Sequence, residues 1–162
     1  MLSDISSGAE TVGALFANPV FLSPLVSLCA AQLTKGIIHA LGGGAKRAGE
    51  LVQAIVWRTG GMPSSHAAVV CSISVALALS EGLGSNMFAF SLWFAMVVLR
   101  DAMGVRMSAG LSARALNKLG RSASDKLGLD YSDVKEIQGH TPLEVVLGGL
   151  LGSFIAAGIY LV

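Results

Sequence analysis

Four long apolar runs restrict what this chain can fold into. They cover about residues 19–41, 63–80, 85–100 and 142–162. A helix rises about 1.5 Å per residue, so runs of this length match the roughly 30 Å hydrocarbon core of a bilayer. With 53% hydrophobic and 13% charged residues among 162, the composition is that of a membrane protein. We expect an all-α integral membrane helical bundle with about four transmembrane helices, forming a single domain.

The basic residues predict how this bundle is oriented. All eleven Lys and Arg lie between Lys35 and Arg58 or between Arg100 and Lys135. With four spans, both basic segments share one face of the membrane, and basic loops favour the cytoplasmic side. That face is therefore expected to be cytoplasmic, or stromal or matrix-facing in an organelle. The net charge of +1, without a basic stripe interleaved with aromatics, argues against nucleic-acid binding.

Two polar loops are expected, over about 42–61 and 101–140. The first contains a short apolar segment, 51–57, that suits an interfacial helix. In the second, residues 109–119 read as a short helix, and residues 121–138 mix charges of both signs without a clear period. This loop suits either a lid or partner surface, or a solvated helical insert.

A polar, glycine-rich turn leads directly into the second apolar run. Residues 60–66 read Gly-Gly-Met-Pro-Ser-Ser-His. Glycines allow close backbone approach, Pro63 suits a first helical turn, and the hydroxyls of Ser64 and Ser65 lie near free N–H groups at a helix start. His66 can exchange a proton near neutral pH. The stretch therefore predicts an anion site, with a simple loop, N-cap and hydrogen-bonded histidine as the alternative.

A second histidine occupies the same kind of position. His140 and Glu144 lie at the start of the fourth run, within Gly-His-Thr-Pro-Leu-Glu. Further along that run, Gly148 and Gly152 form a small-xxx-small pair suited to close helix packing. The chain thus places a histidine just before or at the start of two different apolar helices.

Other polar residues converge on the same membrane face. Gln32, Lys35 and His39 share one face of the first predicted helix, which suggests an inward polar surface, although Lys35 alone could also reach to the interface. Asp101 and Arg106 follow the third run, where they form either a structural ion pair or part of a site. Because these residues come from different spans yet meet at one face, they favour a single polar site.

These stretches resemble the type 2 phosphatidic acid phosphatases, which are related to the vanadium-dependent haloperoxidases, and in particular their divergent bacterial and plant branch. The family motif Pro-Ser-Gly-His is similar to residues 63–66, Pro-Ser-Ser-His. The last family motif is similar to residues 140–144, with Glu144 in place of aspartate. Val134 occupies the position of that motif's arginine, which Arg106 can replace if residues 107–139 are an insertion. The first family motif keeps only Lys35, with Gly42 at its arginine position.

The resemblance implies hydrolysis of a phosphate monoester, in particular a lipid phosphate, without metal or cofactor. In that chemistry His140 attacks phosphorus, Glu144 orients its imidazole and His66 protonates the leaving oxygen. The remaining assigned residues bind phosphate or support the site: Lys35, Arg106, Arg58, Gly61, Ser64 and Ser65 for phosphate, with Asp101 and Gln32 in support.

Two further expectations concern alternatives and assembly. A site that lacks family arginines can bind or transport a lipid phosphate without hydrolysing it, and the histidines can also serve a structural subunit. Four spans are fewer than the family's usual six-helix core, so we expect that a homodimer can complete the bundle. We also expect the spans to contact membrane lipids.

Overall fold

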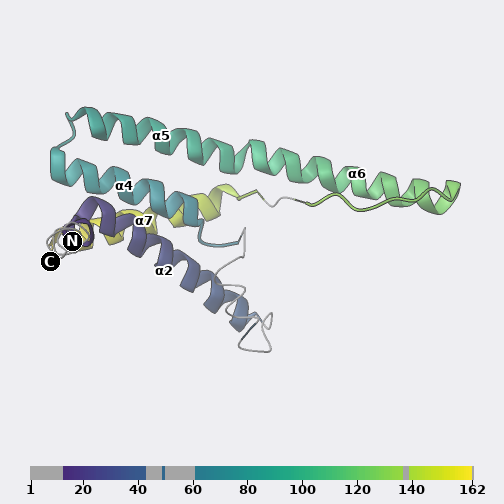
Figure 1. Ribbon diagram of the computed structural model, residues 1–162, viewed down its shortest axis with the longest axis horizontal. Coiled ribbons are helices and arrows are strands. Elements are labelled where there is room, and N and C mark those ends of the chain that lie inside the picture. The colour runs from purple at the N-terminus through teal and green to yellow at the C-terminus, as the bar shows by residue number, and fades with distance from the viewer. Residues whose placement is uncertain (1–12, 43–48, 50–60, 137–138, 162) are drawn as a thin grey trace, which may run out of the picture.

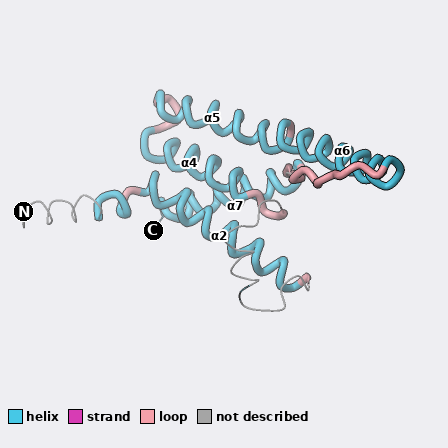
Figure 2. Tube along the Cα trace, turned by 45° about the vertical axis from the view of Figure 1, so that its right-hand side comes forward, coloured by secondary structure: helices cyan, strands magenta, loops and turns pink. Residues whose placement is uncertain are grey.

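The computed structural model describes residues 13–42, 49, 61–136 and 139–161. Within these residues all regular structure is helical (Figures 1 and 2). The helices are α2 (Pro19–Leu41), α4 (Ser65–Glu81), α5 (Asn86–Met103), α6 (Val105–Leu127) and α7 (Pro142–Leu161). The expectation of an all-α helical bundle is confirmed. The predicted interfacial helix at 51–57 lies outside the described residues.

Three of the described helical stretches are long and apolar enough to cross a membrane. They are α2, the apolar part of the continuous α5–α6 stretch, and α7. The second predicted span forms α4, an apolar helix of 17 residues that is shorter than these three. At about 1.5 Å per residue it extends roughly 25 Å. The chain is therefore a helical membrane protein in which the shortest helix occupies the middle of the bundle.

Helix α4 packs against three neighbours, α2, α5 and α7, and α2 also contacts α7 (Figure 1). Small residues make these contacts close. A Cβ atom added at Gly152 would lie 1.9 Å from the Ala68 carbonyl oxygen, and one added at Gly148 would lie 2.2 Å from the Ser64 carbonyl oxygen. These two glycines, predicted to mediate close packing, thus allow the backbones of α4 and α7 to touch.

Helix α6 is longer than the short helix predicted at 109–119 within the polar stretch 101–140. It runs for 23 residues and continues the direction of α5, so that the two helices form one long, nearly straight rod (Figure 1). Mixed charges conceal the helix in the sequence, but its Ala, Leu, Arg and Lys residues all favour helical backbone. Gly128, with φ of +66°, ends the helix in the left-handed conformation. The helical insert was the correct alternative for residues 105–127.

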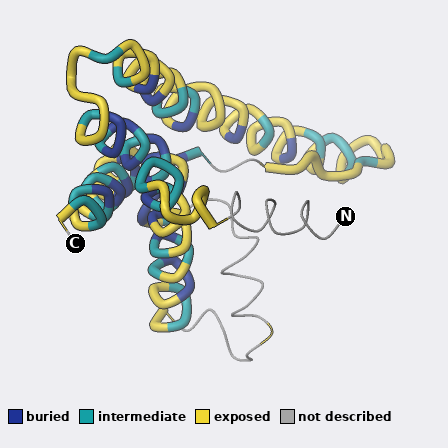
Figure 3. The backbone as a smooth tube through the Cα atoms, turned by 60° about the vertical axis from the view of Figure 1, so that its left-hand side comes forward, coloured by how far each residue is buried: buried dark blue, intermediate teal, exposed yellow. Residues whose placement is uncertain are grey.

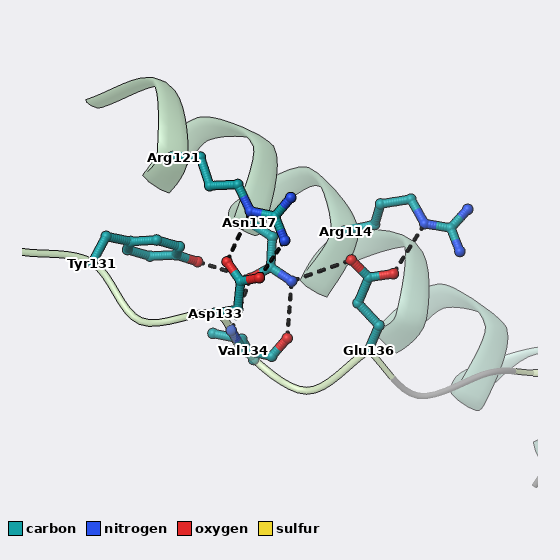
Figure 4. Close-up of polar contacts among 7 residues, drawn as sticks. All are labelled: Arg114, Asn117, Arg121, Tyr131, Asp133, Val134 and Glu136. Carbon is teal, nitrogen blue, oxygen red and sulfur yellow. Dashed lines mark hydrogen bonds and ion pairs between the residues drawn. The ribbon is translucent and has the colours of Figure 1, made fainter. Parts of the chain in front are cut away.

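After Gly128 the chain returns along α6 as residues 128–136, without regular structure (Figures 1 and 4). We call α6 together with this return segment the arm. Asn117 is buried between them: its Nδ2 donates to the Val134 carbonyl at 2.9 Å, and its Oδ1 accepts from the Val134 N–H at 2.8 Å and from the Tyr131 hydroxyl at 2.9 Å. The tyrosine ring lies over Gly120, where a Cβ atom would come within 2.3 Å of it.

Two ion pairs reinforce the arm. Arg121 binds Asp133, and Arg114 binds Glu136 with 3.2 Å between Nε and Oε2 (Figure 4). The hydrogen bond from Arg121 lowers the pKa of Asp133, and hydrogen bonds from Asn117 and Arg114 lower the pKa of Glu136. Both carboxylates are therefore ionised at neutral pH, and the return segment is held to α6 under physiological conditions.

Replacement of Gly152 by alanine tests the close contact between α4 and α7. The added methyl group meets a backbone oxygen, which cannot move without shifting the helix, so Gly152→Ala should destabilise the protein by about 1–3 kcal/mol. Thermal unfolding of the purified protein in detergent measures this loss. Gly158→Ala on the same helix is the matched control, because no atom lies within 4 Å of its added Cβ. Equal melting temperatures for the two variants would contradict the packing described here.

Candidate functional site

The start of α7 is fixed to the end of α5. The His140 backbone N–H donates to the Ala102 carbonyl at 3.0 Å. Beside it, Gly139 packs so closely on the first turn of α6 that a Cβ atom would lie 2.5 Å from the Met107 Cα. The chain therefore leaves the bundle at Arg106 and returns to it at His140. His140 and Arg106, which are far apart in the sequence, are the chain neighbours of Gly139 and Met107, the two residues that touch.

His140 and Glu144 form the best-defined polar pair of the site. The His140 Nδ1 lies 3.0 Å from the Glu144 Oε2, and the imidazole is buried, with 6% of the side chain exposed. A carboxylate beside Nδ1 favours the tautomer that carries its proton there, which leaves the lone pair on Nε2. This is the arrangement that a nucleophilic or basic imidazole requires.

Glu144 also caps the helix on which it lies. The Thr141 N–H donates to Glu144 Oε2 at 3.1 Å, and the Glu144 N–H donates to the Thr141 Oγ1 at 3.4 Å. This reciprocal pair is a capping box, and Pro142 stands at the first helical position that proline prefers. The carboxylate that orients His140 is thereby held by the geometry of the helix start. A Thr-x-x-Glu pattern signals this box in the sequence, although our sequence analysis assigned Thr141 no role.

His66 faces His140 across the mouth of the bundle. It is the second residue of α4, and its ring centroid lies 6.3 Å from that of His140 with the rings tilted by 59°. The charges of Arg106, Lys35 and Asp101 also act on His66. The residues predicted to share the site of His66 come from α2, α5, α6 and α7, and His140, just before α7, lies nearest to it in the described ring contacts.

Lys35 reaches this cluster from α2. Its side chain is buried, with the residue 4% exposed, and Nζ donates to the Ser65 Oγ at 3.0 Å. The charge of Glu144 acts on Lys35 as well. Lys35 is therefore buried and bound to Ser65, the residue before His66, rather than extended to the interface.

The turn before α4 differs from the prediction in one respect. Helix α4 begins at Ser65 with Ser64 as its N-cap, so Pro63 lies before the helix rather than in its first turn. Ser64 is fully buried, its N–H donates to the Glu144 carbonyl at 2.9 Å, and its Oγ accepts from the Ala67 N–H at 3.4 Å. Contact of Ser64 with a phosphate would require these bonds to open. Gly61, with φ of +86°, adopts the left-handed backbone that glycine favours.

Asp101 and Arg106 form an ion pair where α5 meets α6. The Arg106 Nε donates to the Asp101 Oδ2 at 2.7 Å, and both side chains are partly exposed. The ion pair with Asp101 occupies one edge of the guanidinium group. The positive charge of Arg106 also acts on His66. The ion pair exists, and it is compatible with both expectations of the sequence analysis, a structural pair or part of a site.

The sequence profile of the Divergent PAP2 family matches residues 16–155. The chain belongs to this family. It is also similar to the protein named "Uncharacterized membrane protein YuiD" from Bacillus subtilis (strain 168), with 37% identity over 149 residues that cover 85% of this chain and 91% of that protein. No solved structure matches the chain. The resemblance to the divergent branch of the phosphatases is confirmed.

The arm occupies the stretch that the sequence analysis treated as an insertion between Arg106 and His140. Val134 lies in the return segment, where its N–H and carbonyl both bind Asn117. Gly139, the neighbour of His140 in the sequence, packs against Met107, the neighbour of Arg106. This geometry supports the expectation that residues 107–139 are inserted between the arginine and the histidine.

Two predicted site residues are not part of this cluster as described. Arg58 lies outside the described residues. Gln32 lies one turn before Lys35 on α2, and its Oε1 is buried without a hydrogen-bond partner. Among the described residues, no group of three or more His, Cys, Asp or Glu side chains is arranged to hold a metal ion.

Substitution of Lys35 tests whether the cluster binds an anion. Lys35→Met keeps the length of the side chain and removes its charge, so binding of orthovanadate should weaken by about 10- to 100-fold, the worth of a charge-assisted hydrogen bond. Binding is measured by the ligand-dependent rise in melting temperature. Lys118→Met, on the exposed surface of α6, is the control. Unchanged binding in a folded Lys35→Met protein would remove Lys35 from the site.

Proposed function

We propose that this chain is a membrane phosphatase that hydrolyses a lipid phosphate monoester through a phosphohistidine at His140. The observation that carries the proposal is the buried His140–Glu144 pair, joined at 3.0 Å, with His66 facing it from another helix. One imidazole is oriented as a nucleophile by a carboxylate, and a second is positioned to move a proton. Phosphoryl transfer by way of a histidine needs these two groups on opposite sides of the phosphate.

In the first step, the Nε2 lone pair of His140 attacks phosphorus and the bond from phosphorus to the lipid oxygen breaks. His66, in its protonated form, gives its proton to the departing oxygen, so the lipid leaves as an alcohol. In the second step, His66 is neutral and takes a proton from water, whose oxygen attacks phosphorus. The N–P bond breaks, inorganic phosphate leaves, and His140 regains its lone pair.

Two cations can stabilise the charge on the phosphoryl oxygens. Lys35 is buried beside Ser65, and the remaining N–H groups of Arg106 provide a planar donor set. The N-terminal end of α4 adds the positive end of a helix dipole at the same place. Electrostatic stabilisation of this kind is usually the largest contribution to such catalysis.

A groove between α4 and α5 supports a lipid as the substrate. It has a volume of about 1270 Å³ and is lined mainly by apolar residues of these two helices, among them Leu79 and Leu92, with Ser153 of α7. Its end at the α5–α6 junction is lined by Arg100 and Ser108, next to Asp101 and Arg106. The residues of the histidine cluster do not line the groove, so we propose that a lipid tail lies in it with the charged head at the end near the α5–α6 junction.

The site is proposed to face the cytoplasm, or the stroma or matrix in an organelle. The histidines lie at the end of the bundle from which the arm projects, and all described Lys and Arg residues lie at or beyond that end. The positive-inside tendency places such an end on the cytoplasmic side.

A second candidate function is binding or transport of a lipid phosphate without turnover. It is favoured by Val134 and Gly42, which lie where the family has arginines. Arg106 is then the described arginine proposed to take part in the site. The same substitutions distinguish the two functions, because a binding protein would release no phosphate from any lipid.

His140→Ala should abolish phosphate release by the purified protein from a panel of lipid phosphates. Glu144→Gln should reduce kcat by at least about 100-fold, since the imidazole loses the carboxylate that orients it. Release should persist in EDTA, because the proposed steps use no metal. Orthovanadate-dependent stabilisation of each variant shows whether the site is still folded. If the wild-type protein binds vanadate but releases no phosphate, hydrolysis is wrong and the binding function replaces it.

Filling the groove should affect long-chain substrates alone. Leu92→Trp adds bulk to the groove wall and should lower kcat/KM by about 10-fold or more for a long-chain lipid phosphate, while a short soluble phosphomonoester is hydrolysed as before. Val97→Trp, on the same helix but outside the groove, is the control. Equal losses for long and short substrates would show that the groove does not hold the lipid tail.

A further inference from the structure

An apolar stripe runs along α6 and is not covered by any described part of the chain. Val105 is 67% exposed, Leu116 50% and Leu119 68%. The stripe consists of residues at alternating spacings of four and three: Val105, Ala109, Ser112, Leu116, Leu119 and Ala123. Leu127, 70% exposed, lies at its far end. We call these residues the α6 stripe.

The α6 stripe lies outside the membrane. Helix α5, with 18 residues, extends about 27 Å and accounts for most of the bilayer core by itself. Helix α6 continues the same rod for about 34 Å more (Figure 1). Its polar residues, with five Lys and Arg side chains among 23, fit an aqueous environment. The exposed leucines of α6 therefore face water rather than lipid in the isolated chain.

The return segment does not protect the α6 stripe. It binds the face that carries Asn117, Arg121 and Arg114. Figure 3 shows the arm as a rod that is exposed along most of its length. Leu116 and Leu119 stay on the uncovered side, although the network around Asn117 holds the arm rigid.

The spacing of the α6 stripe is that of a coiled coil. Alternating steps of four and three residues average 3.5, and a stripe with this period winds around a second helix in a left-handed supercoil. The flanking residues Ser108, Ala113, Ala115 and Ser122 are small and uncharged, and Gly120 lies under the Tyr131 ring of the return segment. Arg106 is the charged flanking residue, at the start of the stripe. From Ala109 to Ala123, two such helices meet no repulsion between like charges beside the seam. Lys126, at the next position of the pattern, ends it.

We propose that α6 pairs with α6 of a second copy of this chain, parallel and in register. The reason for choosing a second copy as the partner is the common orientation of membrane proteins. Copies inserted in one bilayer share one orientation, and a twofold axis along the membrane normal places equal residues at equal heights. Two rods that project in the same direction then present Leu116 to Leu116 and Leu119 to Leu119. The proposal rests on the membrane bundle and the arm, and is independent of the chemistry at His140.

Disulfide cross-linking in native membranes tests the register. In a background with Cys29→Ala and Cys71→Ala, Leu116→Cys and Leu119→Cys should each form covalent dimers on mild oxidation, since in-register seam positions have Cα atoms close enough for a disulfide. Lys118→Cys lies between them on the same turn but off the stripe, so it should cross-link at least about 10-fold less. Equal dimer yields at the three positions, or no dimer at any of them, would overturn the proposal.

A charge-repulsion variant tests the pairing without oxidation. Leu116→Lys combined with Leu119→Lys should convert the dimer to a monomer in native lipid particles, while helical content and melting of the bundle are retained because both side chains are exposed. A matched double variant on the same helix but away from the stripe and its flanking positions, Lys118→Leu with Asp125→Lys, should stay dimeric. If Leu116→Cys cross-links instead to a protein of different mass, the stripe serves a different partner and self-association is wrong.

Discussion

The contact between α4 and α7 determines how the two histidines of the candidate site lie relative to each other. Gly148 and Gly152 allow the two helix backbones to touch, and at the end of this contact the Ser64 N–H donates to the Glu144 carbonyl. The starts of both helices are therefore at the same level, and each brings its histidine to that level. A bulkier residue at either glycine would separate the helices and with them His66 and His140.

The helix starts also combine structural and chemical roles in the same atoms. One carboxylate oxygen of Glu144 accepts both the Thr141 N–H and the bond from His140. A capping residue is held in place by the helix itself, so the orienting group for His140 needs little additional support. At α4, by contrast, Ser64 caps and is buried, while Ser65 binds the buried Lys35. Local helix geometry thus assigns these neighbouring hydroxyls different tasks.

Much of this arrangement could be predicted from the sequence, for identifiable reasons. Long apolar runs report the membrane helices directly, and histidines beside such runs indicate a site because polar groups are costly there. The extent of α6 could not be predicted, because charges of both signs hide the helical period. In addition, the return segment that packs on α6 is held by Asn117 through contacts between residues far apart in the sequence. The position of Pro63 outside α4 depended on which serine became the N-cap, and both Ser64 and Ser65 have the chemistry for that role.

The place where the arm joins the bundle has a consequence for how this family can vary. The chain departs after Arg106 and re-enters at Gly139, and these two crossing points touch, since Gly139 packs against Met107. A segment whose ends already meet adds little strain whatever its length, because the entropy of closing a loop grows only slowly with the number of residues. The arm is therefore a module that evolution can lengthen, shorten or adapt to new neighbours while the histidine pair beneath it keeps its geometry.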